Sequence, residues 1–160
     1  MSRLLKWPEV ESAFTERYAT QPPAPPSELV RQCESPIEKS LAGALEEILG
    51  GYFRPGTVEI IPQFKLGRFR YDFAIMLIGS TFYGTRPVFL IECDGKEFHG
   101  PGQLENDLAK DAAALEIGAY CLRYRGSDIH RNPYALAAEI ARAVEHMRRW
   151  AFQHERACAS

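Results

Sequence analysis

A short apolar run, residues 88–91, leads directly into Glu92, Cys93 and Asp94 near the middle of the chain. A run of this length without polar interruption is typical of a strand that is covered on both faces. Side chains alternate across a strand, so Glu92 and Asp94 share one face and Cys93 lies on the other. Ionised carboxylates are costly to bury unless they are paired or bind a metal. The pattern therefore predicts a buried strand that ends in two acids on one side, a conflict typical of a functional site.

Alternating apolar and polar residues predict two more strands before this one. Residues 57–65 form the first, interrupted near Pro62 as an edge strand or a bulge would be, and Gly67 turns the chain. Residues 68–78 form the second. One face of the second strand is predicted to carry Phe69, Tyr71, Phe73, Ile75 and Leu77, and the other Arg68, Arg70 and Asp72. A fourth strand, residues 120–125, is expected to lie parallel to the strand that contains Glu92.

A first helix is predicted from Ser35-Pro36-Ile37-Glu38, which combines a capping serine, a proline at the first position and a glutamate three residues on. Gly50-Gly51 is expected to stop this helix. At helical spacing, Glu38 falls inside the apolar stripe of the helix. Glu38 is therefore either a capping acid or an acid that points into the core, and the sequence leaves both interpretations open.

Two more helices are predicted farther along the chain. One spans residues 103–117, with Leu104, Leu108 and Leu115 marking its buried side. The other is a long closing helix that starts at Asn132-Pro133. The element order predicts an α/β fold with a mixed central sheet of about four strands and helices on both faces.

Two parts of the chain are distinguished by composition. Residues 1–26 combine a predicted helix, Pro8 to Tyr18, with a Pro-rich connector, and we interpret them as an appendage. Residues 27–160 form the main domain. The predicted appendage packs on the main domain or on a partner.

Composition narrows the classes of function. The 160 residues are 46% hydrophobic and 25% charged, which is typical of a soluble globular protein. The net charge of −2 gives no broad basic field of the kind that many nucleic-acid-binding proteins carry. The four cysteines lack paired ligand spacing, which favours free thiols in a reducing, cytoplasmic environment. No apolar run is long enough to span a bilayer, so we expect no membrane partner.

The candidate chemistry lies where the predicted strands end. Asp72 and Glu92 come from strands joined by a short connection, Asp94 follows Glu92, and Glu38 approaches from the first helix. Several carboxylates suit a hard divalent cation, Mg²⁺ or Mn²⁺, better than zinc. We expect Asp72, Glu92 and Asp94 to be the metal ligands.

Basic residues near these acids admit two interpretations. Lys96, or Lys110 from the following helix, would stabilise developing negative charge, and His99 would orient water or protonate a leaving oxygen. The alternative is structural, because strand-end acids often form ion pairs and the region also offers several arginines. On this alternative, His99 of the glycine-rich loop is a surface residue or a structural hydrogen-bonding residue.

Together these motifs resemble the restriction-endonuclease-like, or PD-(D/E)XK, superfamily of nucleases, and most closely the branch of very-short-patch-repair endonucleases and their small relatives. The resemblance covers about residues 35–144. The motifs that carry it, in chain order, are Ser35-Pro36-Ile37-Glu38, Gln63, Tyr71-Asp72-Phe73, Ile91-Glu92-Cys93-Asp94-Gly95, His99, Asp107, Lys110, Gly118 and Leu122-Arg123-Tyr124.

The resemblance implies a three-layer core and a metal held by Asp72 and Glu92, with the Cys93 carbonyl as a further ligand. It implies that Glu38 is the helix-borne acid of the site. The chain departs from the pattern at Asp94, which occupies the place of the signature lysine. Small relatives also carry an acid there, which favours a second metal ligand over a dead site.

The resemblance implies metal-dependent hydrolysis of phosphodiester bonds in DNA, in repair or restriction, with catalytic candidates Glu38, Asp72, Glu92, Asp94, Lys96 and His99. Arg68, Arg70 and Lys110 are expected to contact the nucleic acid. A chain of this size is expected to cut both strands only as a homodimer or with a partner protein. Two alternatives stay open: an inactive nuclease-fold module that binds DNA or protein, and a small-molecule phosphohydrolase.

Overall fold

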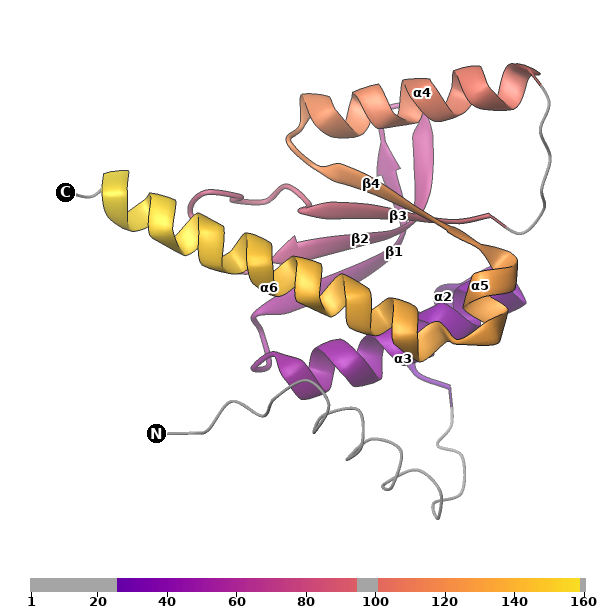
Figure 1. The fold of residues 1–160 in the computed structure, drawn as a ribbon, viewed down its shortest axis with the longest axis horizontal. Coiled ribbons are helices and arrows are strands. Elements are labelled where there is room, and N and C mark those ends of the chain that lie inside the picture. The colour runs from indigo at the N-terminus through magenta and orange to yellow at the C-terminus, as the bar shows by residue number, and fades with distance from the viewer. Residues whose placement is uncertain (1–25, 95–100, 159–160) are drawn as a thin grey trace, which may run out of the picture.

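A four-stranded mixed sheet forms the centre of the computed structural model, which describes residues 26–94 and 101–158 (Figure 1). The strands are β1 (Val58–Leu66), β2 (Phe69–Leu77), β3 (Phe89–Asp94) and β4 (Tyr120–Arg125), in the spatial order β1-β2-β3-β4. The β1–β2 and β2–β3 pairs are antiparallel, and β3 and β4 are parallel. The predicted α/β class, the mixed sheet and the parallel fourth strand are confirmed.

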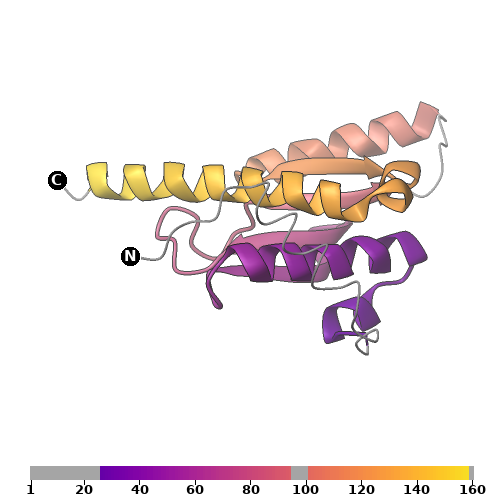
Figure 2. The ribbon, with the colours of Figure 1, turned by 60° about the horizontal axis from the view of Figure 1, so that its bottom comes forward.

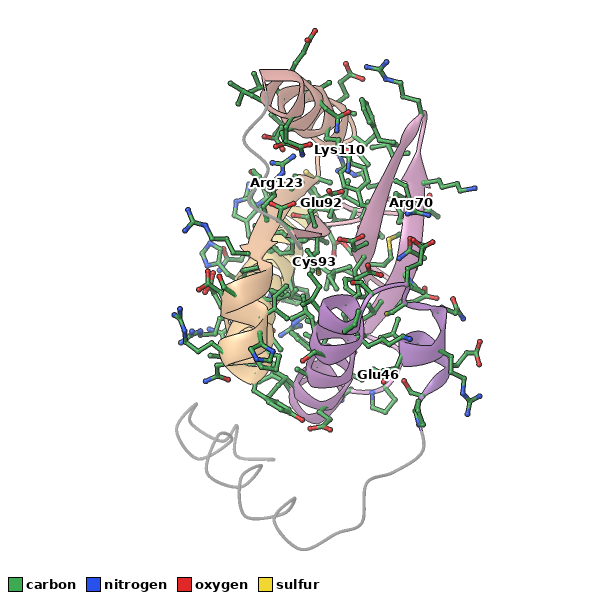
Figure 3. All side chains as sticks on the ribbon, turned by 90° about the vertical axis from the view of Figure 1, so that its right-hand side faces the viewer. Glu46, Arg70, Glu92, Cys93, Lys110 and Arg123 are labelled. Carbon is green, nitrogen blue, oxygen red and sulfur yellow. The ribbon has the colours of Figure 1, made fainter. Side chains whose placement is uncertain are left out.

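Helices cover both faces of this sheet. The described helices are α2 (Glu28–Gln32), α3 (Pro36–Tyr52), α4 (Pro101–Glu116), α5 (Gly126–Arg131) and α6 (Pro133–Cys158). The long helices α3 and α6 pack against each other and against the sheet. Figures 2 and 3 show α4 on the opposite side of the strands from α3. The short helices α2 and α5 were not predicted.

Strand β3 is buried on both faces, as its apolar run predicted. Phe89 and Ile91 belong to the larger core, which they share with residues of α3 and α6. Leu90 belongs to a smaller core on the other face, together with Ala114 of α4. Glu92 follows this buried run, so it lies away from the centre of the protein, near the strand end that α4 covers.

The predicted face of β2 is wrong for its first half. Phe73 packs in the larger core, but Tyr71 lies in the smaller core with Ala74. The two faces exchange at Asp72, which lies across from Gln63 of β1, between the Cα pairs on either side of them. Gln63 has a φ of 51°, in the left-handed region, and the register continues past it without an inserted residue. Of the two interpretations of the pattern near Pro62, an edge strand or a bulge, the edge position of β1 is confirmed.

Helix α3 starts as predicted but runs through Gly50-Gly51 to Tyr52, so the predicted stop is wrong. The tertiary packing of Ile48 and Leu49 in the larger core outweighs the low helix propensity of the two glycines.

The predicted buried side of α4 is also wrong. Leu104, Leu108 and Leu115 are 64%, 60% and 62% exposed. Ala114 is buried instead, and Lys110 is directed at the sheet. This helix turns polar side chains inward because the strand end that it covers is charged.

The remaining predictions on the fold concern the N-terminus and the membrane. The predicted helix from Pro8 to Tyr18 and the connector up to residue 25 lie outside the described residues. No helix in the described part of the chain is long and apolar enough to cross a membrane.

Candidate functional site

Asp72 and Glu92 are neighbours in the sheet, as the sequence predicted. Phe73 of β2 pairs with Ile91 of β3, and Asp72 and Glu92 follow one residue farther along this antiparallel pair. The Cys93 N–H donates a hydrogen bond of 2.6 Å to Asp72 Oδ2, which fixes the carboxylate against the next strand. Two acids therefore lie side by side where the β2–β3 pairing ends.

Glu92 is held by Lys110 of α4. Lys110 Nζ donates to both carboxylate oxygens of Glu92 at 2.7 Å, and to the backbone oxygen of Arg70 at 3.1 Å. Both side chains are largely withdrawn from solvent, with exposures of 15% for Lys110 and 12% for Glu92. In Figure 3, Lys110 lies above Glu92, between α4 and the sheet. This partly buried ion pair connects the helix to the candidate site.

Tyr71 fixes the backbone of α4 near the same lysine. Its hydroxyl donates to the Lys110 backbone oxygen at 2.8 Å, and its ring lies 5.4 Å from Lys110 Nζ. Because the side chains of β2 exchange faces at Asp72, Tyr71 points toward α4 and not into the larger core. The sequence pattern gave no indication of this contact.

Glu38 is a capping acid and also an inward-pointing one, so both interpretations of it hold. The Glu38 N–H donates to the capping Ser35 Oγ at 3.2 Å. Its carboxylate, in a residue only 7% exposed, accepts from the Glu34 N–H at 2.9 Å and from Gln63 Nε2 at 2.8 Å. Both donors use Oε2, and Gln63 thereby ties the start of α3 to β1.

Burial raises the pKa of both strand-end acids above the usual range for a carboxyl group. The pKa of Asp72 is raised by burial and by the charge of Glu38, and the hydrogen bond from Cys93 partly offsets this rise. The pKa of Glu92 is raised by burial and by Asp72, and Lys110 partly offsets this rise. Burial is the largest cause at both positions, and the neighbouring carboxylate adds to it.

Most of the nearby cations are already paired with acids. Arg70 forms a bidentate ion pair with Glu34, at 2.8 and 2.9 Å. Arg123 donates to Asp111 Oδ1 at 2.7 Å. Arg68 is exposed beside the β1–β2 turn, with its guanidinium 4.8 Å from the centre of the Phe69 ring. Of the three predicted nucleic-acid contacts, Arg70 and Lys110 are thus held by carboxylates, whereas Arg68 is exposed.

The predicted metal ligands do not converge in this conformation. Over residues 26–94 and 101–158, no three His, Cys, Asp or Glu side chains are arranged to hold a metal ion. Asp94 is exposed at the end of β3, while Lys96 and His99 lie outside the described residues. The ligand set Asp72, Glu92 and Asp94 stays a prediction.

The donor atoms nevertheless fit a hard divalent cation in kind. Three carboxylates, Glu38, Asp72 and Glu92, come from α3, β2 and β3. Gln63 Oε1, on the amide that binds Glu38, is buried without a hydrogen-bond partner in the described part of the chain. Carboxylate and amide oxygens are the ligands that Mg²⁺ and Mn²⁺ prefer. Gln63 belongs to the motif pattern, but its role at the site was not predicted.

Comparisons with known proteins give no assignment. Neither a protein-family model, nor a curated protein, nor a solved structure matches this chain. The function is therefore argued from the site itself.

Proposed function

We propose that this chain is a divalent-cation-dependent phosphodiesterase of the restriction-endonuclease-like type, acting on DNA. The observation that carries the proposal is the pair of partly buried acids on adjacent strands, Asp72 and Glu92, whose pKa values are raised chiefly by burial. The element order supports it, because a helix, an antiparallel three-stranded unit, a helix and a parallel strand follow one another as the resemblance implies. Acids whose pKa values are perturbed by burial and by charged neighbours are typical of functional sites.

Asp72 and Glu92 would hold the cation, with the Gln63 amide oxygen as a further candidate ligand. When bound, Mg²⁺ or Mn²⁺ polarises a phosphoryl oxygen and makes a bound water more acidic. The protein supplies fixed positions for its ligands. The Cys93 N–H orients Asp72, and the Glu34 N–H and Gln63 amide orient Glu38.

Lys110 would supply the positive charge that the signature lysine provides elsewhere. Asp94 occupies the lysine's place in the strand, and Lys110 reaches Glu92 from α4. Arg68, exposed beside the β1–β2 turn, is suited to a DNA phosphate. The site thus combines acids for a cation with basic groups for a polyanion.

A second candidate function is a non-catalytic binding module that keeps its acids as structural ion pairs. The Lys110–Glu92 and Arg70–Glu34 pairs favour this alternative, since both are already formed in the described structure. The two candidates differ in whether a divalent cation binds.

A cleavage assay on plasmid and single-stranded DNA, with Mg²⁺ or Mn²⁺, tests the proposal. We expect the wild-type protein to cleave, EDTA to abolish cleavage and Glu92→Gln to be inactive. Glu59→Gln is the matched control, because Glu59 is an exposed acid on β1 that forms no part of the site. A folded wild-type protein with no cleavage, and no change in melting temperature on adding Mn²⁺, would leave the binding module as the better assignment. A panel of nucleotides in the same assay separates DNA hydrolysis from hydrolysis of small molecules.

A further inference from the structure

The side chain of Lys110 occupies the carboxylate that the proposed cation needs. Its ammonium group donates to both oxygens of Glu92 at the same distance, 2.7 Å. A divalent cation on Glu92 would need lone pairs of these same oxygens, and it would repel a second positive charge beside it. Lys110 and a divalent cation therefore compete for one carboxylate.

We propose that Lys110 is a built-in counter-cation, which neutralises Glu92 in the cation-free protein and is displaced from it when a divalent cation binds. This inference rests on the proposed function and adds an exchange step to it. The Glu92 carboxylate loses the single positive charge of Lys110 and gains the two positive charges of the cation. The cation-free protein thereby avoids an unpaired buried acid, which would be costly to fold around.

The surroundings of Lys110 allow this exchange without movement of α4. The helix backbone is held independently, by the Tyr71 hydroxyl on the Lys110 backbone oxygen and by Arg123 Nη2 on the Asp107 backbone oxygen. Lysine has a flexible four-carbon stem and three donors, so its ammonium group can turn while its backbone stays in place.

The displaced ammonium group keeps partners within reach. It already donates to the Arg70 backbone oxygen at 3.1 Å and lies 5.4 Å from the centre of the Tyr71 ring. These contacts retain the positive charge next to the site but leave donors free for an anion. The exchange therefore makes Lys110 available to a phosphate only after the cation has bound, and so orders the two binding events.

Calorimetric titration of Mn²⁺ into metal-free protein tests the competition directly. Three proteins are compared: wild type, Lys110→Met and the control Lys39→Met, in which the substituted lysine is exposed on α3 and is not the lysine that pairs with Glu92. The Lys110→Met protein lacks the competing charged hydrogen bond, so we expect it to bind Mn²⁺ about tenfold or more tightly than the wild type does. The Lys39→Met protein is expected to bind as the wild type does.

The outcomes separate this inference from the function beneath it. Equal Mn²⁺ affinity in wild type and Lys110→Met overturns the exchange and leaves the cation-dependent function in place. Binding by none of the three proteins overturns the function, and the exchange with it.

A measurement on the wild-type protein covers the case in which Lys110→Met does not fold. Acetylation of lysines, followed by mass spectrometry, reports how available each ammonium group is. Adding Mn²⁺ is expected to speed acetylation of Lys110 relative to Lys39, because the ion pair with Glu92 has opened. An unchanged ratio, at a Mn²⁺ concentration that saturates the protein, overturns the exchange.

Discussion

The hydrogen bond between Glu38 and Gln63 is expected to be one of the strongest single polar contacts in the described fold. It joins the start of α3 to β1 at 2.8 Å, and its acceptor is a carboxylate in a residue only 7% exposed. We consider the variants Glu38→Ala, Gln63→Ala and the double variant. Glu38→Ala removes the acceptor of the Gln63 amide, and Gln63→Ala leaves the Glu38 carboxylate with the Glu34 N–H.

The magnitude follows from charge and burial. A hydrogen bond to a charged group contributes roughly 1.5–3 kcal/mol to the free energy of unfolding, whereas an exposed ion pair contributes only about 0.2–1 kcal/mol. The Arg70–Glu34 pair supplies a matched contrast, because it is equally short at 2.8 Å but its side chains are 50% and 57% exposed. We therefore expect a larger coupling energy for the Glu38–Gln63 contact than for the Arg70–Glu34 ion pair.

Double-mutant cycles in urea measure both coupling energies. The cycle cancels the separate effects of losing the contact between Glu38 and the Glu34 N–H and of changing a residue with positive φ at Gln63. We expect a coupling of about 1.5 kcal/mol or more for Glu38–Gln63 and below about 1 kcal/mol for Arg70–Glu34. Equal couplings, or the reverse order, would refute the reasoning that burial, and not distance, decides the strength of these contacts.

Three further predictions concern stability and reactivity. Because burial raises the pKa of Asp72, the folded protein loses stability as pH rises through that pKa. Asp72→Asn should therefore raise the melting temperature at pH 8 and have little effect on it below pH about 4. Leu108→Ala should change the free energy of unfolding by less than about 0.5 kcal/mol, and Leu45→Ala, at a fully buried position, should reduce it by about 2–5 kcal/mol, as urea denaturation will show. The exposed Cys158 should react quickly with a chromogenic disulfide, whereas Cys93, whose thiol pKa is raised by burial, should react only on unfolding.

Apolar periodicity predicted the parts of the fold in which tertiary packing agrees with the local pattern. Strand β3 is an example, because its apolar run enters both cores. The faces of β2 were not predictable in this way, since a single left-handed residue at Gln63, on the neighbouring strand, marks the level where they exchange. Periodicity describes one strand at a time and carries no information about a distortion shared by two. Among the candidate acids, the neighbouring positions of Asp72 and Glu92 were predictable because only strand order was needed.

The wrongly predicted buried side of α4 and the charge of the candidate site have one cause. A helix normally turns its leucines inward, and here Leu104, Leu108 and Leu115 face solvent. The inward side carries Lys110 on Glu92 and Asp111 on Arg123, because the strand end beneath it presents charges that require partners. Burying leucines there would leave Glu92 desolvated and unpaired, a loss of about 3–5 kcal/mol. A helix whose leucines face solvent while a lysine faces the sheet therefore indicates charged side chains, and so a candidate site, at the strand end beneath it.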